Sequence, residues 1–265
     1  VGARWPGRAA QWSCPADALE AAVANEGARV ISLENVTVTF GGVRPLDDLS
    51  AELTAGIHGV IGPNGAGKTT LLNVLSGFTP TTAGRVCVDG VDLASMSPEA
   101  RARWGLRRTF QTDQLAGWRT VHENVAVMAD TTMHHSQRRE AVGAARDFVG
   151  RTHPERAAGS LTVLERRLAE LARALVGTPR VVLMDEPASG MVAHETDEFA
   201  ALVRRIPEQF GAQVVLIEHD MDLVAALCEE VLVLDFGRCL ATGATDVVLQ
   251  DRSVRAAWLG EEIAT

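Results

Sequence analysis

Lysine is almost absent from this chain of 265 residues. Lys68 is the single lysine, and every other basic side chain apart from histidine is arginine. A high genomic GC content favours arginine codons, so the bias itself carries no function. A lysine kept in such a chain nevertheless indicates a position that needs a compact ammonium group, which a planar guanidinium replaces poorly.

Cysteine and long apolar runs are scarce as well. The four cysteines, Cys14, Cys87, Cys228 and Cys239, lie far apart without CxxC spacing, which favours reduced thiols over a disulfide or metal framework. No apolar run approaches the ~18 residues needed to cross a bilayer, and no signal-peptide pattern is present. If the protein works at a membrane, we expect it to do so through a partner.

Composition and the start of the chain set further bounds. The net charge of −9 argues against a nucleic-acid partner, and a hydrophobic fraction of 46% allows a substantial core. The first residue is valine, so we expect either a start codon other than AUG or a piece of a longer chain. Residues 1–28, with an alanine-rich stretch at 16–24 that fits one helix, are predicted to be a loose extension or the tail of a fused domain, without chemistry of their own.

The lone lysine stands in a glycine-rich segment, Gly62-Pro63-Asn64-Gly65-Ala66-Gly67-Lys68-Thr69-Thr70. The segment matches the phosphate-binding P-loop pattern G-x-x-x-x-G-K-[ST], and it lies between a strand-like run and a helical run as that pattern requires. Glycines let backbone N–H groups turn towards anionic oxygens, and the following helix adds its positive end. Lys68 is expected to reach the β- and γ-phosphates of a nucleotide and Thr69 to bind Mg²⁺. The alternative is a glycine-rich turn beside an ordinary helix start.

Two carboxylates follow a short apolar strand. Residues 181–184 run directly into Asp185 and Glu186, at the carboxyl end of a strand, where α/β sheets bind ligands. Alternation along the strand gives the two side chains different directions. We therefore predict that Asp185 faces the magnesium and that Glu186 polarises an attacking water. The alternative is a pair of solvated acids at a strand end.

His219 repeats this placement on another strand. Residues 214–217 are apolar and lead through Glu218 to His219. A histidine at such a strand end is expected to donate a hydrogen bond to the γ-phosphate and to orient the water. The alternative is a histidine with a purely structural role.

Apolar periodicity gives the order of the elements. Strands are predicted at residues 30–40, 46–53, 57–61, 85–88, 181–184, 214–217, 231–235 and 238–241. Helices are predicted at 98–104, 121–128, 137–149, 163–176, 195–206 and 221–227, with a polar stretch at 130–136 between two of them. The alternation of strand and helix predicts an α/β sheet with a helical insertion at about residues 115–175.

The motifs together resemble a known family. The P-loop, the segment Arg108-Thr109-Phe110-Gln111, the segment Asp185-Glu186-Pro187 and His219 come in the order and spacing of an ATP-binding cassette (ABC) ATPase. The resemblance extends over about residues 29–260 and places the ATPase domain at 29–262. Segments 36–42, 217–221 and 257–261 are most similar to the branched-chain amino acid importers.

This resemblance implies a fold and a set of partners. It implies a P-loop NTPase of the ABC type: a mixed sheet core, an antiparallel β subdomain and an inserted α-helical subdomain. It implies ATP and Mg²⁺ as cofactors, and an ATPase on the cytoplasmic face of the plasma membrane, bound peripherally to permease subunits. A second ABC ATPase subunit and, indirectly, an extracytoplasmic solute-binding protein complete the implied assembly. The transported solute and the choice between homodimer and heterodimer are not specified by these motifs.

The resemblance also assigns roles to two further residues. Phe40 resembles the aromatic residue that stacks on adenine, the alternative being a core residue of its strand. Gln111 resembles the glutamine that touches magnesium and water and senses the membrane partner, the alternative being an exposed loop amide.

The family's LSGGQ signature departs from its pattern here, where it reads Leu161-Thr162-Val163-Leu164-Glu165. In the family this loop binds the γ-phosphate of the ATP held by the opposite subunit, and Thr162 keeps a hydroxyl for that contact. Both glycines are replaced, and Leu164 is expected to place a bulky chain where the backbone approaches phosphate. Thr162 and Glu165 also form a capping-box pattern, so the segment alternatively only starts a helix. Two functions therefore stay open: a hydrolysing importer subunit, and a weakly hydrolysing nucleotide sensor in a heterodimer. A third, a soluble ABC protein acting on DNA or ribosomes, is disfavoured by the acidic charge and by the lack of a long coiled-coil insertion or a second cassette.

A second departure follows the two carboxylates. Val192 stands where the family usually has an aspartate, although the importer branch often lacks that aspartate.

Overall fold

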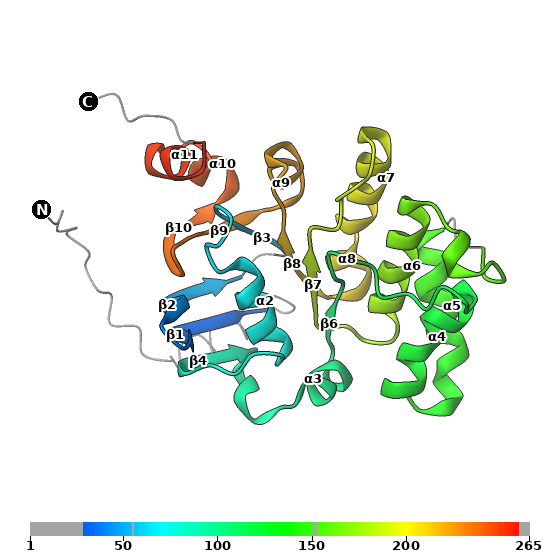
Figure 1. The fold of residues 1–265 in the computed structure, drawn as a ribbon. Coiled ribbons are helices and arrows are strands. Elements are labelled where there is room, and N and C mark those ends of the chain that lie inside the picture. The colour runs from blue at the N-terminus through cyan, green and yellow to red at the C-terminus, as the bar shows by residue number, and fades with distance from the viewer. Residues whose placement is uncertain (1–28, 55, 151–152, 260–265) are drawn as a thin grey trace, which may run out of the picture.

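The computed structural model describes residues 29–54, 56–150 and 153–259. The alanine-rich stretch at 16–24 and the end of segment 257–261 lie outside the described residues. Two sheets and a group of helices make up the described chain (Figure 1).

The smaller sheet is antiparallel and has the strand order β2-β1-β4-β5. Its strands are β1 (Ile31–Phe40), β2 (Val43–Leu53), β4 (Ala83–Val88) and β5 (Val91–Asp92). Alternation explains the register, since Val36 and Val38 are buried on one face of β1 while Thr37 between them is not. This sheet is the antiparallel β subdomain that the family resemblance implied.

The larger sheet is mixed and has the order β10-β9-β3-β8-β7-β6. Its strands are β3 (Ile57–Ile61), β6 (Leu106–Arg108), β7 (Val181–Asp185), β8 (Gln213–Ile217), β9 (Glu230–Asp235) and β10 (Arg238–Ala244). Five of them run parallel, and β10 pairs antiparallel with β9 at the edge. Every residue of β3, β7 and β8 is buried, as expected for parallel strands covered on both faces. The predicted fold class is confirmed.

The helices are α2 (Lys68–Ser76), α3 (Pro98–Trp104), α4 (Val121–Thr132), α5 (His135–Val149), α6 (Val163–Leu175), α7 (Ala193–Val203), α8 (Ile206–Phe210), α9 (Met221–Leu227), α10 (Thr245–Val248) and α11 (Arg252–Leu259). Figure 1 shows α4, α5 and α6 packed together at the side of the molecule away from the antiparallel sheet. None of the helices in the described ranges has the length and apolar character needed to span a bilayer.

Two predicted boundaries are wrong. The helix predicted at 195–206 ends at Val203, and a second helix begins at Ile206, because Pro207 lacks an N–H group and fits only the first turn of a helix. The polar stretch at 130–136 is largely helical, since α4 continues to Thr132 and α5 begins at His135. The Thr132 hydroxyl donates to the carbonyl of Met128 within that helix.

Apolar residues form two clusters, one on each face of the larger sheet. Val182 and Met184 of β7 join the cluster beneath α6 and α7, whereas Val181 and Leu183 join the cluster shared with α2 and the antiparallel sheet. The alternation of β7 thus ties both layers to one strand. The carboxyl ends of β3, β7 and β8 meet at one edge of this sheet, which is where the candidate site lies.

Candidate functional site

The P-loop joins β3 to α2. Gly67 precedes the helix with a φ of 106°, and Gly62 has a φ of 144°, in the region that side chains rarely adopt. A Cβ on Gly62 would lie 2.1 Å from the carbonyl oxygen of Leu234, and one on Gly67 would lie 2.2 Å from that of Pro45. Close packing against the neighbouring backbone therefore requires glycine at both positions.

Lys68 is the first residue of α2 and is buried. Its Nζ donates to the carbonyl oxygens of Gly62 at 2.7 Å and Pro63 at 2.9 Å. Burial lowers the pKa of Lys68, and the charges of Glu186 and Asp185 oppose that shift. Those two carboxylates therefore favour the charged ammonium at the mouth of the loop.

Asp185 ends β7 and is held by Arg108 of the neighbouring strand. Its Oδ2 accepts a hydrogen bond from Arg108 Nη2 at 3.0 Å, and both side chains are buried. Arg108 also donates to Asn73 and Ser76 of α2 and lies 4.8 Å from the ring centroid of Phe110. Burial lowers the pKa of Arg108, and Asp185 opposes that shift.

The contact between Arg108 and Asp185 was not predicted from the sequence. It depends on the pairing of β6 with β7, and β6 is a three-residue strand with two arginines that was itself missed. Its sequence lacks the apolar pattern of the other parallel strands, so no periodicity marks it.

Glu186 lies between the two other predicted catalytic residues. Its Oε2 accepts a hydrogen bond from Gln111 Nε2 at 2.7 Å, and its Oε1 lies 2.6 Å from His219 Nε2. The second contact requires one proton between the carboxylate and the imidazole. Three residues that are far apart in the sequence are thus brought together, and Gln111 is an exposed loop amide whose side chain is bonded to Glu186.

Glu218 supports the neighbouring loop and was not assigned a role from the sequence. Its carboxylate accepts hydrogen bonds from the backbone N–H groups of Ala188 and His219. Burial raises the pKa of Glu218, and the charge of Glu186 raises it further. Through its two hydrogen bonds, the Glu218 side chain fixes the segment that follows Glu186 and Pro187.

Phe40 stands at the end of β1 with 56% of its surface exposed. The alternative that it is a core residue of its strand is wrong, because the core-facing positions of β1 end at Val38. Thr69 is also exposed, at the start of α2.

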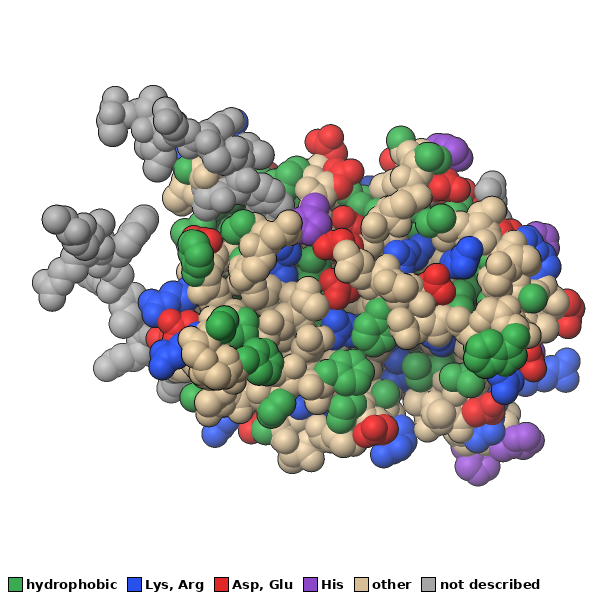
Figure 2. All heavy atoms as spheres, in the orientation of Figure 1, with side chains coloured by type: hydrophobic (Ala, Val, Ile, Leu, Met, Phe, Trp, Pro, Cys, Tyr) green, Lys and Arg blue, Asp and Glu red, His purple; other side chains and the backbone are tan. Residues whose placement is uncertain are grey.

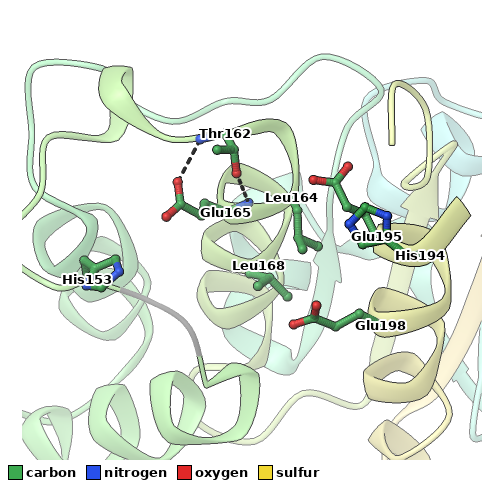
Figure 3. A pocket seen from close by; sticks show the side chains of 8 residues that line it. All are labelled: His153, Thr162, Leu164, Glu165, Leu168, His194, Glu195 and Glu198. Carbon is green, nitrogen blue, oxygen red and sulfur yellow. Dashed lines mark hydrogen bonds between the residues drawn. The ribbon is translucent and has the colours of Figure 1, made fainter. Parts of the chain in front are cut away.

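Thr162 begins α6 with a complete capping box. Its Oγ1 accepts from the N–H of Glu165 at 3.2 Å, and the Glu165 carboxylate accepts from the N–H of Thr162 at 2.8 Å (Figure 3). In the described part of the chain, the hydrogen bonds of Thr162 remain within this helix start. The structure therefore does not bring Thr162 to the P-loop of its own chain.

Leu164 points inward, contrary to expectation. Only 6% of it is exposed, and together with Leu168 it lines a pocket of about 470 Å³ between α6 and α7 (Figure 3). Val163 is the exposed apolar residue of the segment, at 42%. Val163 and not Leu164 therefore presents an apolar side chain at the surface of this segment, because consecutive residues of a helix point about 100° apart.

The predicted magnesium ligands suit that ion. Thr69, Gln111 and Asp185 offer hydroxyl, amide and carboxylate oxygens, which are the hard donors that Mg²⁺ prefers. Within the described ranges, no group of three or more His, Cys, Asp or Glu side chains forms a metal cluster.

Comparison with known proteins gives concordant matches. The family model described as ABC transporter matches residues 46–189. The chain is 31% identical to the high-affinity branched-chain amino acid transport ATP-binding protein BraF of Pseudomonas aeruginosa, over 88% of this chain and 98% of that protein. It is 38% identical to the methionine import ATP-binding protein MetN of Myxococcus xanthus, over 82% of this chain and 68% of that protein. A crystal structure of an ABC transporter's ATP-binding cassette in its ADP conformation superposes with a TM-score of 0.78 at 28% identity, over 88% of this chain and 99% of that one.

Proposed function

The chain belongs to the ABC transporter family as an ATP-hydrolysing subunit, and from that premise we propose that it powers an importer with ATP bound at the P-loop. The observation that carries the proposal is the meeting of Glu186, Gln111 and His219 beside Lys68. A nucleotide held by the P-loop would place its terminal phosphate within reach of these groups.

The P-loop residues each have a task in binding. Backbone N–H groups of residues 62–70, apart from Pro63, would line the phosphates, and the start of α2 favours their negative charge. Lys68 donates to two neutral carbonyls in this structure, and phosphate oxygens are stronger acceptors for its ammonium group. Phe40 offers an exposed ring on which adenine stacks.

Hydrolysis is assigned to Glu186 and its two neighbours. Glu186 orients and polarises the attacking water, Gln111 fixes one oxygen of its carboxylate, and His219 fixes the other. Thr69, Asp185 and Gln111 would hold Mg²⁺, which neutralises charge on the phosphates when it is bound. Arg108 holds one oxygen of Asp185 and so sets the direction of that carboxylate.

A second subunit completes each site. ABC ATPase subunits dimerise and work with membrane permeases. We assign the Thr162 segment of one subunit to the γ-phosphate bound by the other, because this segment forms a helix start, where the first N–H groups have no partner within the helix. The dimer would bind peripherally at the cytoplasmic face of the membrane.

The cargo is assigned from the relatives alone. BraF serves branched-chain amino acid transport and MetN serves methionine import, and both transport amino acids. We propose a branched-chain or related amino acid, delivered by an extracytoplasmic solute-binding protein to the permease.

A specific observation keeps a second function in view. Val163 exposes an apolar side chain where the family has glycine, and a β-branched chain there separates the backbone from a phosphate. The alternative is a subunit that binds ATP at its own P-loop and supplies a weak signature segment to a more competent partner in a heterodimer.

One experiment tests the function and separates these two forms. ATPase activity is measured for the purified chain, and again after reconstitution with its permease and solute-binding protein in liposomes, with Lys68→Met as the control. An importer subunit hydrolyses ATP in both settings and faster with solute present, and Lys68→Met removes both activities. Hydrolysis only in the presence of a different ATPase subunit establishes the heterodimer. Solute uptake that Lys68→Met leaves unchanged contradicts the proposal.

A further inference from the structure

Three charged side chains, two of them buried and Arg173 half-buried, lie on one face of the helix that starts at the signature segment. Arg167, Glu170 and Arg173 are spaced three residues apart on α6, and Glu170 is only 1% exposed. Arg167 Nη1 lies 3.2 Å from one oxygen of Glu170, and Arg173 Nη2 lies 3.4 Å from the other. Buried ion pairs are stable only where further hydrogen bonds satisfy their remaining donors and acceptors. The partners in those hydrogen bonds therefore indicate the role of the cluster.

The remaining hydrogen bonds of the cluster go to one short stretch of main chain, residues 110–114. Arg167 donates to the carbonyl oxygens of Phe110 at 2.9 Å and Gln111 at 2.7 Å. On the other side, Arg173 donates to the Gln114 carbonyl at 2.8 Å, and Glu170 accepts from the Gln114 N–H at 3.0 Å. The cluster therefore holds the backbone around Gln111 through hydrogen bonds to residues 110, 111 and 114.

Gln111 connects the cluster to the candidate site. Its backbone carbonyl is held by Arg167 of α6, and its side chain donates to Glu186 at 2.7 Å. A continuous set of contacts thus runs from the helical group, through Gln111, to the carboxylate that faces His219. Because each contact is a hydrogen bond with a narrow range of length and angle, a shift of α6 against the large sheet changes the position of the Gln111 amide.

We propose that Arg167, Glu170 and Arg173 are positioning residues that set the reach of Gln111 towards Glu186 and so couple the placement of α6 to hydrolysis. The proposal rests on the proposed function of Glu186. Arg167 acts through the backbone carbonyl of Gln111. A purely structural role of the cluster would instead alter folding and leave the effects of Arg167 and Gln111 independent.

A double-mutant cycle between Arg167 and Gln111 tests this. Lysine at 167 keeps the charge but lacks the planar fork that reaches two carbonyls and Glu170 together. We expect Arg167→Lys and Gln111→Ala each to lower the single-turnover rate constant by about 10- to 100-fold, as small misplacements of catalytic groups do. Arg167→Lys is expected to change the Kd for ATP by less than about 2-fold. The double variant is expected to be no slower than Gln111→Ala alone.

Two further variants complete the design. Arg166→Lys changes the adjacent arginine of the same helix, which lies outside the cluster, and is expected to leave the rate within about 2-fold of wild type. Glu170→Gln keeps the size of the side chain, and we expect it to slow turnover in the wild-type background but not in Gln111→Ala. It serves as the cycle partner if Arg167→Lys does not fold.

If the rate constant of the double variant falls by the product of the two single effects, Arg167 and Gln111 act independently and the positioning role is overturned. A loss of ATP binding in Arg167→Lys that accounts for its slower rate overturns it as well. Glu186→Gln separates this result from the proposed function. If Glu186→Gln abolishes turnover while the cycle multiplies, only the positioning role fails. If Glu186→Gln turns over normally, the assignment of Glu186 fails, and with it both proposals.

Discussion

Glu186 adopts an unusual backbone conformation for a residue with a side chain. Its φ is +48°, in the left-handed region that costs non-glycine residues of the order of 1–3 kcal/mol and that persists where surrounding contacts over-determine it. The surrounding contacts here are a backbone hydrogen bond to Ile217 and the side-chain contacts to Gln111 and His219. The strained turn directs the carboxylate away from the line of β7.

Substitutions at the neighbouring residues Val163 and Leu164 are expected to have opposite effects on ATPase activity and stability. Val163→Gly removes an exposed side chain at the first helical position of α6, so we expect ATPase activity of the dimer to rise by about 2-fold or more while stability falls by less than about 1 kcal/mol. Leu164→Ala removes buried apolar contacts, so we expect stability to fall by about 2–3 kcal/mol with no gain in rate. Urea unfolding and steady-state ATPase assays measure both. If Leu164→Ala raises the ATPase rate and Val163→Gly leaves it unchanged, Leu164 and not Val163 obstructs the phosphate contact.

His58 makes stability depend on pH. Burial in β3 lowers its pKa from 6.5 to about 4. Among the described residues neither ring nitrogen has a hydrogen-bond partner, and Glu230 Oε2 lies 3.5 Å from Nδ1. Above pH 6.5 the ring is neutral in both states and has no effect. As the pH falls from 6.5 towards 4, the unfolded chain gains a proton that the folded chain does not. Stability contributed by this residue is therefore lost on acidification, by about 2 kcal/mol between pH 7 and pH 5.

His58→Phe is the test of that pH dependence, with His122→Gln on the surface of α4 as its control. Urea unfolding at pH 7 and pH 5 is expected to show a smaller acid loss for His58→Phe than for wild type, whereas His122→Gln keeps the wild-type loss. An equal loss in His58→Phe and wild type rules out His58 as the cause.

At the scale of elements, two helices begin with the same capping box and allow a matched comparison. Thr162 caps α6 and Thr120 caps α4, each with a glutamate three residues later. Thr162→Ala and Thr120→Ala are each expected to lower stability by about 1 kcal/mol. Only Thr162→Ala is expected to lower ATPase activity of the dimer beyond its effect on folding, because only that hydroxyl is assigned to a phosphate. Equal activities for the two variants would assign Thr162 to helix capping alone.

The sequence predicted those elements whose local pattern and tertiary surroundings agree. The strand, loop and helix around Lys68 were predicted because glycine and lysine positions define the P-loop without reference to the rest of the chain. The short strand β6 was missed because two of its three residues are arginine and its partner is β7, more than seventy residues away. The inward direction of Leu164 was missed because it depends on where α7 packs.

The same distinction applies to the site. Glu186, Gln111 and His219 were each predicted from their place after a strand or in a motif, and their mutual contacts follow from the parallel order of the larger sheet. The support around them was not predicted. Arg108, Arg167 and Glu218 act through contacts between elements, and the residues adjacent to them in sequence do not reveal those contacts.

At the scale of the molecule, one sheet edge gathers residues from four separate segments. The P-loop follows β3, Gln111 follows β6, Glu186 follows β7 and His219 follows β8. Thr162 makes no hydrogen bond to these groups within the described residues, and our proposal assigns it to the site of a second chain. On the face shown in Figure 2, acidic, basic and hydrophobic side chains are interspersed across both the sheets and the helical group.

Two subunits that close around ATP should stay closed when the water is not activated. Glu186→Gln preserves the size of the side chain and removes its charge, so it affects proton acceptance more than packing or nucleotide contacts. The variant is therefore expected to accumulate as an ATP-bound dimer, which wild type forms only in passing.

The most direct experiment incubates purified Glu186→Gln with radiolabelled ATP, measures the molar mass by light scattering, and analyses the labelled nucleotide and phosphate. The account predicts that the variant binds ATP with an affinity close to that of wild type, has the mass of a dimer with the nucleotide intact, and releases phosphate at least about 100-fold more slowly. Phosphate release at the wild-type rate would contradict it.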